Sequence, residues 1–306
     1  MKDLLNKDFT LNWMNYSLEL GQRTHVMGIL NVTPDSFSDG GRYLEREKAI
    51  EHGIAMARDG ADMIDVGGES TRPYSKKISV DEEMERVIPV IEALSQALKI
   101  PICIDTYKSE IARMAIKAGA SMINDISAFR FDPGLISVVQ ESGVPVILMH
   151  MKGTPDNMQD NPTYDNLIHE ILDFHNSAVD RALNGGIKRD MIIIDPGIGF
   201  GKTFDHNLQI IRDLTKFHSL GRPILFGTSR KTFIGHILDR EVHDRDTGTM
   251  ATIAAGVMNG AHIIRVHDVK KGVETVKVID AIKRGAFIRM EKKIWHDIKA
   301  LPGQLK

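Results

Sequence analysis

Cysteine is almost absent from this chain of 306 residues, and so is any excess of charge of one sign. The single cysteine, Cys103, lies in an apolar run, so no disulfide can form within the chain. The formal net charge of -2 gives no sign of a nucleic-acid or membrane-surface partner. An apolar content of 42% favours one large globular domain.

Long hydrophobic runs are missing too. No stretch approaches the length of a bilayer span, and the charged residues 1–8 lack the apolar segment of a signal peptide. We therefore expect a protein of a reducing, bacterial-type cytoplasm.

Motifs for metal and nucleotide binding are also lacking. His169-Glu170 begins like a zinc motif, but the next histidine lies too far along the chain, and no cysteine cluster exists. The turn after Asp195 resembles two phosphate motifs and matches neither. Pro196 stands where a P-loop requires Gly, and Lys202 where a dinucleotide fingerprint requires Gly. The sequence therefore predicts no dedicated protein-bound metal, and the turn does not indicate a nucleotide.

The chain does contain a succession of short apolar runs that end in polar residues, with helical segments between them. The runs are 25–30, 63–64, 102–104, 122–123, 145–149, 191–194, 223–226 and 263–264. Gly60, Gly119 and Gly260 each precede a run and follow a helical pattern, as in a helix-to-strand turn. The segments 87–94 and 208–214 show apolar positions three and four residues apart, which is typical of amphipathic helices.

This alternation predicts an α/β fold, a single-domain (β/α)8 TIM barrel. A doubly wound open sheet is the alternative, because the pattern alone cannot show closure. We assign residues 25–285 to the barrel and 1–24 to an N-terminal extension, either a cap over the bottom of the barrel or a frayed arm. Residues 286–306 are assigned to a helical C-terminal tail.

In such a barrel the carboxyl ends of the strands form one rim. The polar residues expected there are Asn31, Asp65, Asp105, Asn124, His150, Asp195, Ser229, Arg265 and His267. Taken singly, Asp105 could cap a helix, Asn124 could support a turn and Asp65 could hold a strand-end backbone group. Their convergence favours a polar small-molecule site in an apolar bowl.

Asp195 ends the most apolar of these runs. A carboxylate there is costly unless it meets a protein partner or a ligand that offers hydrogen-bond donors. Two long loops, 31–42 and 67–73, carry glycines, hydroxyls and an arginine, which suit an anionic ligand.

Six segments together resemble the signature segments of the dihydropteroate synthase family, in family order, from about residue 25 to 285. They are 31–41, 67–73, 123–126, 195–202, 228–231 and 265–269. The resemblance implies a folate-biosynthesis barrel that joins 6-hydroxymethyl-7,8-dihydropterin pyrophosphate to 4-aminobenzoate, with Mg2+ present and pyrophosphate released. It also implies a homodimer through the last helices and a 4-aminobenzoate pocket that sulfonamides would occupy.

The resemblance carries over residue by residue. The pterin would contact Asp105, Asn124, Met149, Asp195, Phe200, Lys231 and Arg265. The pyrophosphate would be held by Asn31, Thr71, Arg72, Arg265 and His267, with Asn31 also a ligand of Mg2+. The 4-aminobenzoate pocket would comprise Thr33, Pro34, Phe37, Pro73, Ser229 and Lys231. The catalytic group would be Asp105, Lys231, Arg265 and His267.

The chain departs from the family pattern after Pro73, where the usual Gly-Ala is replaced by Tyr74-Ser75-Lys76-Lys77. Three rival interpretations remain. A pterin-binding methyltransferase would not need Ser229-Arg-Lys231 or the two anion loops. A sugar-phosphate isomerase or aldolase would place a catalytic Lys or Glu within a strand. A non-catalytic pterin carrier would be expected to lose Lys231 or the pair Arg265 and His267.

Overall fold

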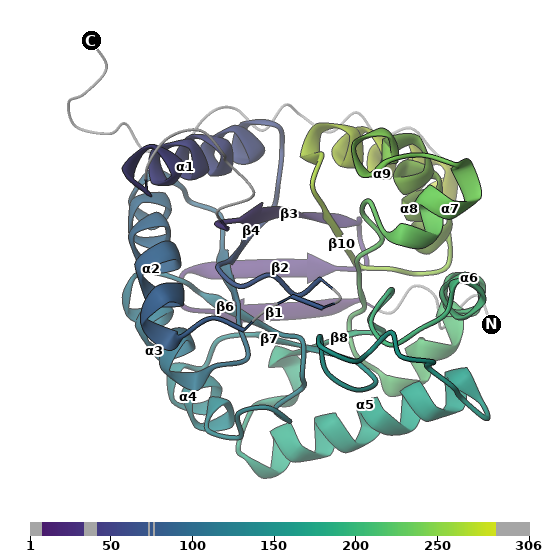
Figure 1. Cartoon of the computed structure of the whole chain (residues 1–306), viewed down its shortest axis with the longest axis horizontal. Coiled ribbons are helices and arrows are strands. Elements are labelled where there is room, and N and C mark those ends of the chain that lie inside the picture. Colours follow the sequence, from purple (N-terminus) through teal and green to yellow (C-terminus); the bar gives the residue numbers. More distant parts are fainter. Residues whose placement is uncertain (1–7, 34–41, 73, 76, 286–306) are drawn as a thin grey trace.

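Eight parallel strands and the helices between them form a barrel in the computed structural model (Figure 1). The residues described are 8–33, 42–72, 74–75 and 77–285. The barrel strands are β3 (His25–Asn31), β4 (Met63–Gly67), β5 (Ile102–Asp105), β6 (Met122–Asp125), β7 (Val146–Met149), β8 (Ile192–Asp195), β9 (Leu225–Phe226) and β10 (Ile263–Val266). Each of the eight apolar runs supplies one of these strands.

The sheet closes almost completely. Its strand order is β8-β7-β6-β5-β4-β3-β10-β9, so β8 and β9 are the two ends of the sheet. A parallel bridge between Ile194 and Ile224 joins these ends. The structure therefore confirms the TIM barrel and excludes the open sheet.

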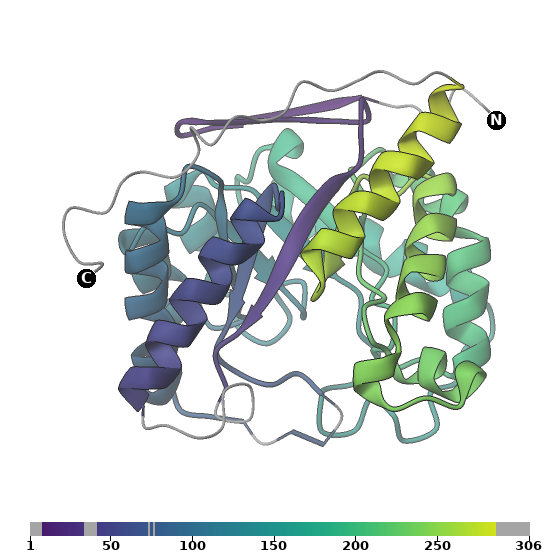
Figure 2. The same cartoon turned by 90° about the horizontal axis from the view of Figure 1, so that it is seen from above.

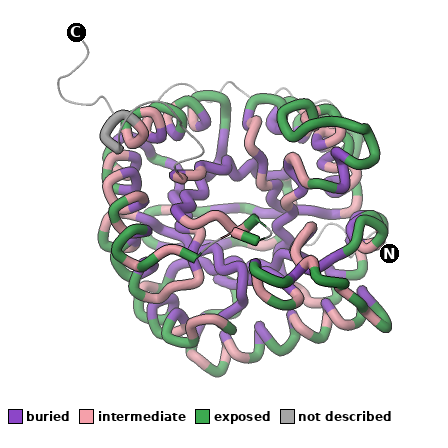
Figure 3. Tube along the Cα trace, viewed as in Figure 1, coloured by how far each residue is buried: buried purple, intermediate pink, exposed green. Residues whose placement is uncertain are grey.

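The strands are buried because helices cover their outer face, as Figure 3 shows. All residues of β4, β7 and β8 are buried. Burial on both faces explains why β7 is apolar throughout and β8 is apolar up to its last residue, Asp195. β4 differs, because it carries the buried Asp65 at its centre.

The helices are α1 (Arg42–Arg58), α2 (Val80–Ala97), α3 (Ser109–Lys117), α4 (Leu135–Ser142), α5 (Leu167–Asn184), α6 (Phe204–Arg212), α7 (Thr232–Leu238), α8 (Asp246–Met258) and α9 (Val269–Arg284). Short 3-10 turns are η3 (Arg189–Met191), η4 (Leu214–Leu220) and η5 (Val242–Asp244). Gly60, Gly119 and Gly260 have φ angles of 100°, 110° and 94°, as the predicted turns require. The segment 208–214 does not form one amphipathic helix: α6 ends at Arg212, η4 follows, and Leu208 is exposed.

Residues before the barrel form an antiparallel hairpin of β1 (Phe9–Trp13) and β2 (Tyr16–Leu20). The hairpin lies across the end of the barrel where the strands begin (Figure 2). The indole Nε1 of Trp13 donates to the backbone oxygen of Ser121, just before β6, over 2.7 Å. The tail at 286–306 lies outside the described residues, so our domain limits stay a prediction. No helix in the described part of the chain is long and apolar enough to cross a bilayer.

Candidate active site

The strand register brings the predicted rim residues to one level. Asn31 pairs with Gly67, Gly67 with Asp105, and Asp105 with Asn124 across four neighbouring strands. On the other side of the barrel, the register pairs Met149 with Asp195. Side chains from β3 to β8 therefore meet at the same mouth, opposite the hairpin.

Arg265 on β10 ties the strand ends together. Its Nε donates to Oδ2 of Asp65 over 2.5 Å, and its Nη2 donates to Oδ2 of Asp105 over 2.8 Å. Asn124 Nδ2 donates to the same Asp65 oxygen over 3.1 Å. The plainer interpretations of Asp65 and Asp105 are therefore wrong: Asp65 binds side chains, and α3 begins at Ser109, beyond Asp105.

Burial and the close contacts among Asp65, Asp105 and Arg265 shift the pKa values of the latter two residues. Burial and the neighbouring Asp65 carboxylate raise the pKa of Asp105 to about 7, although Arg265 opposes the shift. The pKa of Arg265 itself is raised, because the two carboxylates outweigh its burial. Asp105 can therefore gain or lose a proton near neutrality, whereas Arg265 stays cationic.

Asp195 at the end of β8 is buried and lacks a cation in direct contact. Its Oδ1 accepts from the backbone N–H of Gly197 over 2.7 Å, and no ion pair within the described residues involves its carboxylate. Burial raises its pKa to about 6, against the lowering effects of this hydrogen bond and of Lys231, Lys202 and Arg265. Such a carboxylate is suited to a ligand with hydrogen-bond donors.

The turn after Asp195 requires glycine. Gly197 has a φ of 72°, and a Cβ there would lie 1.9 Å from the backbone oxygen of His150. Below the turn, Lys202 is buried, with Nζ 2.8 Å from Nδ1 of His150 and 2.9 Å from the backbone oxygen of Phe200. The ring of His150 thus contacts Lys202 behind the turn, although we expected it to join the polar rim.

A small apolar cluster lines the mouth beside Asp195. It contains Met149 and Phe200, which the resemblance assigns to the pterin, and also Ile126, Met151 and Met158. Lys231 lies over the Phe200 ring, with Nζ 4.1 Å from the ring centroid. Burial and Arg265 lower the pKa of Lys231 to about 8, so its amine is still mostly protonated at neutral pH.

Ser229 and His267 form a pair on the side of β9 and β10. The Ser229 hydroxyl lies 2.8 Å from Nδ1 of His267 and accepts from the His267 backbone N–H over 3.2 Å. Burial and the nearby cations, Arg265 foremost, lower the pKa of His267 to about 3. The ring is therefore neutral in the free protein, and in the tautomer in which Nδ1 accepts from the Ser229 hydroxyl, Nε2–H is left as a donor.

Between Ser229 and Lys231, Arg230 has a φ of 57°, in the left-handed region that favours glycine. Its N–H donates to Thr249 Oγ1 over 3.0 Å, and its guanidinium Nε donates to Asp246 over 3.0 Å. These contacts from α8 hold a strained turn between two predicted site residues.

Three predicted residues, Pro34, Phe37 and Pro73, lie outside the described residues. Thr33 and Thr71 are half-buried at the mouth, and Arg72 is exposed. Arg72 is one of the cations that lower the pKa of His267, so these two residues share one electrostatic environment.

The structure describes Tyr74, the first residue at which the chain departs from the family pattern. Tyr74 adopts a φ of 63°, its N–H donates to the Pro155 backbone oxygen over 3.1 Å, and its hydroxyl donates to Asp160 over 3.1 Å.

The main residues missed by sequence reasoning are Asp65, Ile126 and Lys202. Asp65 was expected at the rim without a ligand-site role, yet it is fully buried and is the shared acceptor for Arg265 and Asn124. Ile126 ended one of the recognised segments, which was a usable signal. Nothing in the sequence indicated that Lys202 would be buried.

Comparisons with known proteins agree on one family. Residues 27–267 match the family model described as pterin binding enzyme. The dihydropteroate synthase of Synechocystis sp. is 48% identical over 265 residues, which cover 86% of this chain and 92% of that protein.

Solved structures show the same likeness. A Yersinia pestis dihydropteroate synthase in a sulfonamide drug complex has a TM-score of 0.86 and 42% identity, covering 90% of this chain and 100% of that one. A Xanthomonas albilineans dihydropteroate synthase with 4-aminobenzoic acid has a TM-score of 0.85 and 42% identity, covering 90% and 99%.

Proposed function

The chain belongs to the family of pterin-binding enzymes, and on this premise we infer that it acts as a dihydropteroate synthase. It is a transferase of folate biosynthesis that condenses 6-hydroxymethyl-7,8-dihydropterin pyrophosphate with 4-aminobenzoate. The products are 7,8-dihydropteroate and pyrophosphate. A sulfonamide, which resembles 4-aminobenzoate in shape and charge, would compete for the same pocket.

The observation that best supports this function is the buried carboxylate of Asp195. A pterin presents a 2-amino group and an N3–H side by side, much like one edge of a guanidinium. A carboxylate can accept both hydrogen bonds in parallel, which compensates the cost of its burial. We therefore assign Asp195 to this edge of the ring.

The other pterin contacts are those that the family resemblance implies. Asp105 and Asn124 would bind further ring heteroatoms, and Lys231 would donate to the oxygen side of the ring. The apolar side chains of Met149 and Phe200 would line its faces, and Arg265 would stack on it, as a guanidinium does on delocalised rings.

The pyrophosphate is assigned to donors that face the other side of the mouth. They are Asn31, Thr71, Arg72, Arg265 and His267. The neutral ring of His267 would donate from Nε2, while Arg72 and Arg265 would supply charge.

Mg2+ fits this site as an ion carried mainly by the substrate. Within the described residues no group of three or more His, Cys, Asp or Glu side chains gathers as a metal cage. The side-chain oxygen of Asn31 lies at the mouth beside Gly67 and offers one ligand of the type that Mg2+ prefers. When bound, the ion would stabilise the charge on the departing pyrophosphate.

The amine would bind next to Lys231. Thr33 and Ser229 are assigned to its pocket, together with Pro34, Phe37 and Pro73. An arylamine is unprotonated at neutral pH, so its attack on the pterin methylene needs no strong base. The harder step is the departure of pyrophosphate, which Arg265 and His267 would assist by binding its developing charge. We assign Arg265 and His267, with Lys231 and Asp105 at the pterin, as the catalytic group.

A homodimer in the cytoplasm completes the proposal. Helices α7 to α9 lie side by side, and apolar side chains on or next to them are exposed. These are Ile237, Leu238, Val242, Met258, Val278 and Ile282. A second copy of the chain would bury this apolar surface. Sedimentation of the purified protein tests the dimer.

The activity is tested by a coupled assay for pyrophosphate release. The release should require both the pterin pyrophosphate and 4-aminobenzoate. Hydrolysis that does not depend on the amine would favour another function, and binding of the pterin without any release would favour a pterin carrier. Methyl transfer in place of release would favour a pterin-binding methyltransferase.

A further inference from the structure

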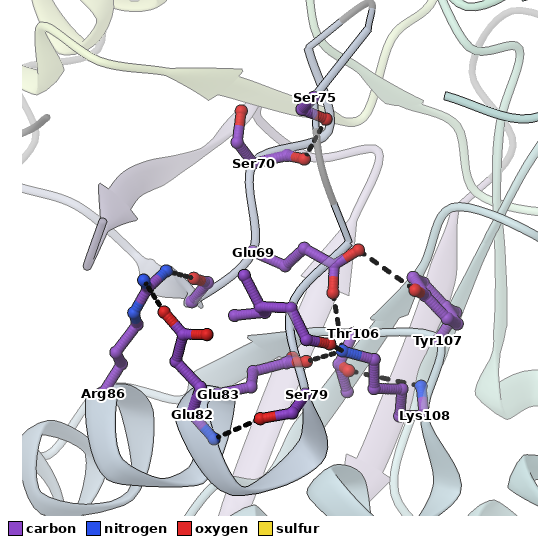
Figure 4. A network of polar contacts seen from close by, with 12 residues as sticks. Glu69, Ser70, Ser75, Ser79, Glu82, Glu83, Arg86, Thr106, Tyr107 and Lys108 are labelled. Atoms are coloured by element: carbon purple, nitrogen blue, oxygen red, sulfur yellow. Dashed lines mark hydrogen bonds and ion pairs between the residues drawn. The ribbon is translucent and has the colours of Figure 1, made fainter. Parts of the chain in front are cut away.

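The ammonium of Lys108 is fully engaged beneath the loop that joins β4 to α2 (Figure 4). Its Nζ donates to Glu69 Oε2 over 2.6 Å, to Glu83 Oε2 over 2.7 Å and to the backbone oxygen of Ile78 over 2.9 Å. An ammonium has three N–H donors, so all of them are used. The exposed fractions are 13% for Lys108, 9% for Glu69 and 1% for Glu83, so this is a largely buried ion cluster.

These contacts hold both ends of the loop. Glu69 lies two residues after β4 ends, and Ile78 lies two residues before α2 begins. Arg86 also connects α2 to the start of the loop, because its Nη1 donates to the backbone oxygen of Gly68 over 2.8 Å. Lys108 therefore fixes the distance across the base of the loop.

The same cluster attaches the loop to the rim of the barrel. The second carboxylate oxygen of Glu69 accepts from the Tyr107 hydroxyl over 3.0 Å. Tyr107 follows Thr106, whose N–H donates to the backbone oxygen of Asn124 over 3.1 Å. Thr71 from the loop and Asp105 from β5 line one narrow recess with this cluster. A shift of Glu69 would thus change where Thr71 stands relative to Asp105.

The charge of the cluster also matters to an anion above it. Two carboxylates, Glu69 and Glu83, lie under the loop, and Lys108 is the cation in contact with both. Burial lowers the pKa of Lys108, but the two carboxylates outweigh that effect and raise it overall. The ammonium therefore remains charged and shields an anionic ligand from the carboxylates.

We propose that Lys108 and Glu69 are positioning residues that hold the loop carrying Thr71 and Arg72 in the conformation that receives the pyrophosphate group of the substrate. The proposal rests on the proposed function, which assigns Thr71 and Arg72 to pyrophosphate. Neither Lys108 nor Glu69 touches the substrate; both act through the loop. Displacement of a binding group by about 1 Å can reduce a rate by on the order of 100-fold.

The test compares two ligands on the full-length protein by calorimetry: inorganic pyrophosphate with Mg2+, and 6-hydroxymethylpterin, which lacks the pyrophosphate. Glu69→Ala removes the anchor, and Glu69→Gln keeps an oxygen for Lys108. Lys108→Met leaves two buried carboxylates unpaired and can fail to fold, so the Glu69 variants carry the test. Glu141→Ala is the matched control, because Glu141 forms an exposed ion pair with Arg113 over 2.6 Å.

Glu69→Ala should weaken pyrophosphate binding by about tenfold or more and leave pterin binding within about twofold, with Glu69→Gln recovering most of the loss. Equal loss of affinity for both ligands, or no loss for either, would overturn the proposal.

Arg72→Ala separates the positioning role of Glu69 and Lys108 from the assignment of this loop to pyrophosphate. If it weakens pyrophosphate binding but Glu69→Ala does not, the positioning role fails and the assignment of Arg72 stands. If Arg72→Ala has no effect, the assignment of this loop to pyrophosphate fails, and the positioning role fails with it.

Discussion

Arg265 donates from Nε to Oδ2 of Asp65 over 2.5 Å, although 200 residues separate the two in the chain. Asp65 is fully buried, and the same guanidinium also pairs with Asp105. One guanidinium thus pairs with carboxylates on two adjacent strands of the candidate site. Its removal would leave buried negative charge without a partner.

Arg265→Met should therefore destabilise the fold by roughly 3–5 kcal/mol, the usual result of breaking a buried ion pair from one side. Urea denaturation measures this loss. The control is Arg113→Met, whose partner Glu141 is exposed, and it should cost about 0–1 kcal/mol. Similar losses in the two variants would mean that the Arg265 pair is as screened as a surface pair.

Asp195→Asn should have opposite effects on stability and binding. The pKa of Asp195 is raised to about 6 from 3.8, so above pH 6 the fold carries the cost of an ionised, buried carboxylate. Asparagine removes that cost, which should stabilise the free protein by up to about 3 kcal/mol at pH 7. Binding of a pterin analogue should weaken by roughly 2–4 kcal/mol, because a neutral amide presents one acceptor in place of a charged pair. Calorimetry and thermal unfolding measure the two effects, and wild-type affinity in the variant would remove Asp195 from the site.

Pterin affinity should fall as the pH drops through the pKa of Asp195. The ligand requires the ionised carboxylate, so affinity is highest above pH 6 and should be about tenfold lower at pH 5. Asp105, with a pKa of about 7, is the second group that can contribute. Titrations of Asp195→Asn and Asp105→Asn separate them. If the pterin affinity of Asp195→Asn still falls with decreasing pH as in the wild type, a group other than Asp195 causes the pH dependence.

The strands could be predicted from sequence because burial on both faces gives continuous apolar runs, and the helix-to-strand turns because they need glycine at a positive φ. The helix predicted over 208–214 was wrong because α6 stops at Arg212, so Leu214 lies in the following 3-10 turn and not on the face of α6.

The partners of the site residues could not be predicted in the same way. The pairing of Asp65 with Arg265 depends on the pairing of β10, the last strand in the chain, with β3, which places β4 and β10 on either side of β3. The burial of Lys202 depends on acceptors from His150 and Phe200 that meet only in the folded turn. Local sequence carries neither kind of information.

The hairpin before the barrel should contribute to stability and not to catalysis. Trp13→Phe keeps an aromatic ring but removes the donor to the backbone oxygen of Ser121, leaving a buried acceptor unpaired. We expect a loss of about 1–3 kcal/mol in the free energy of unfolding, with kcat unchanged. Asn12→Ala, at an exposed position of the same strand, is the control. A fall in kcat at unchanged stability would indicate a link between the hairpin and the active site.

The last prediction concerns the order in which the substrates bind. The pterin contacts Asp105 and Asp195 stand on strand ends that the barrel holds in place, whereas Arg72 stands exposed on a loop. Pyrophosphate with Mg2+ can draw Arg72 inward above the base that Lys108 and Glu69 hold, and so provide ordering free energy that a small aromatic acid cannot recover from its own few contacts. We expect 4-aminobenzoate to bind the free protein weakly. In the presence of pyrophosphate and Mg2+ it should bind at least tenfold more tightly, a gain of about 1.4 kcal/mol. Calorimetric titrations with and without pyrophosphate measure the gain, which Arg72→Ala should abolish. Equal affinities in the two titrations would show that the loop does not control access of the amine.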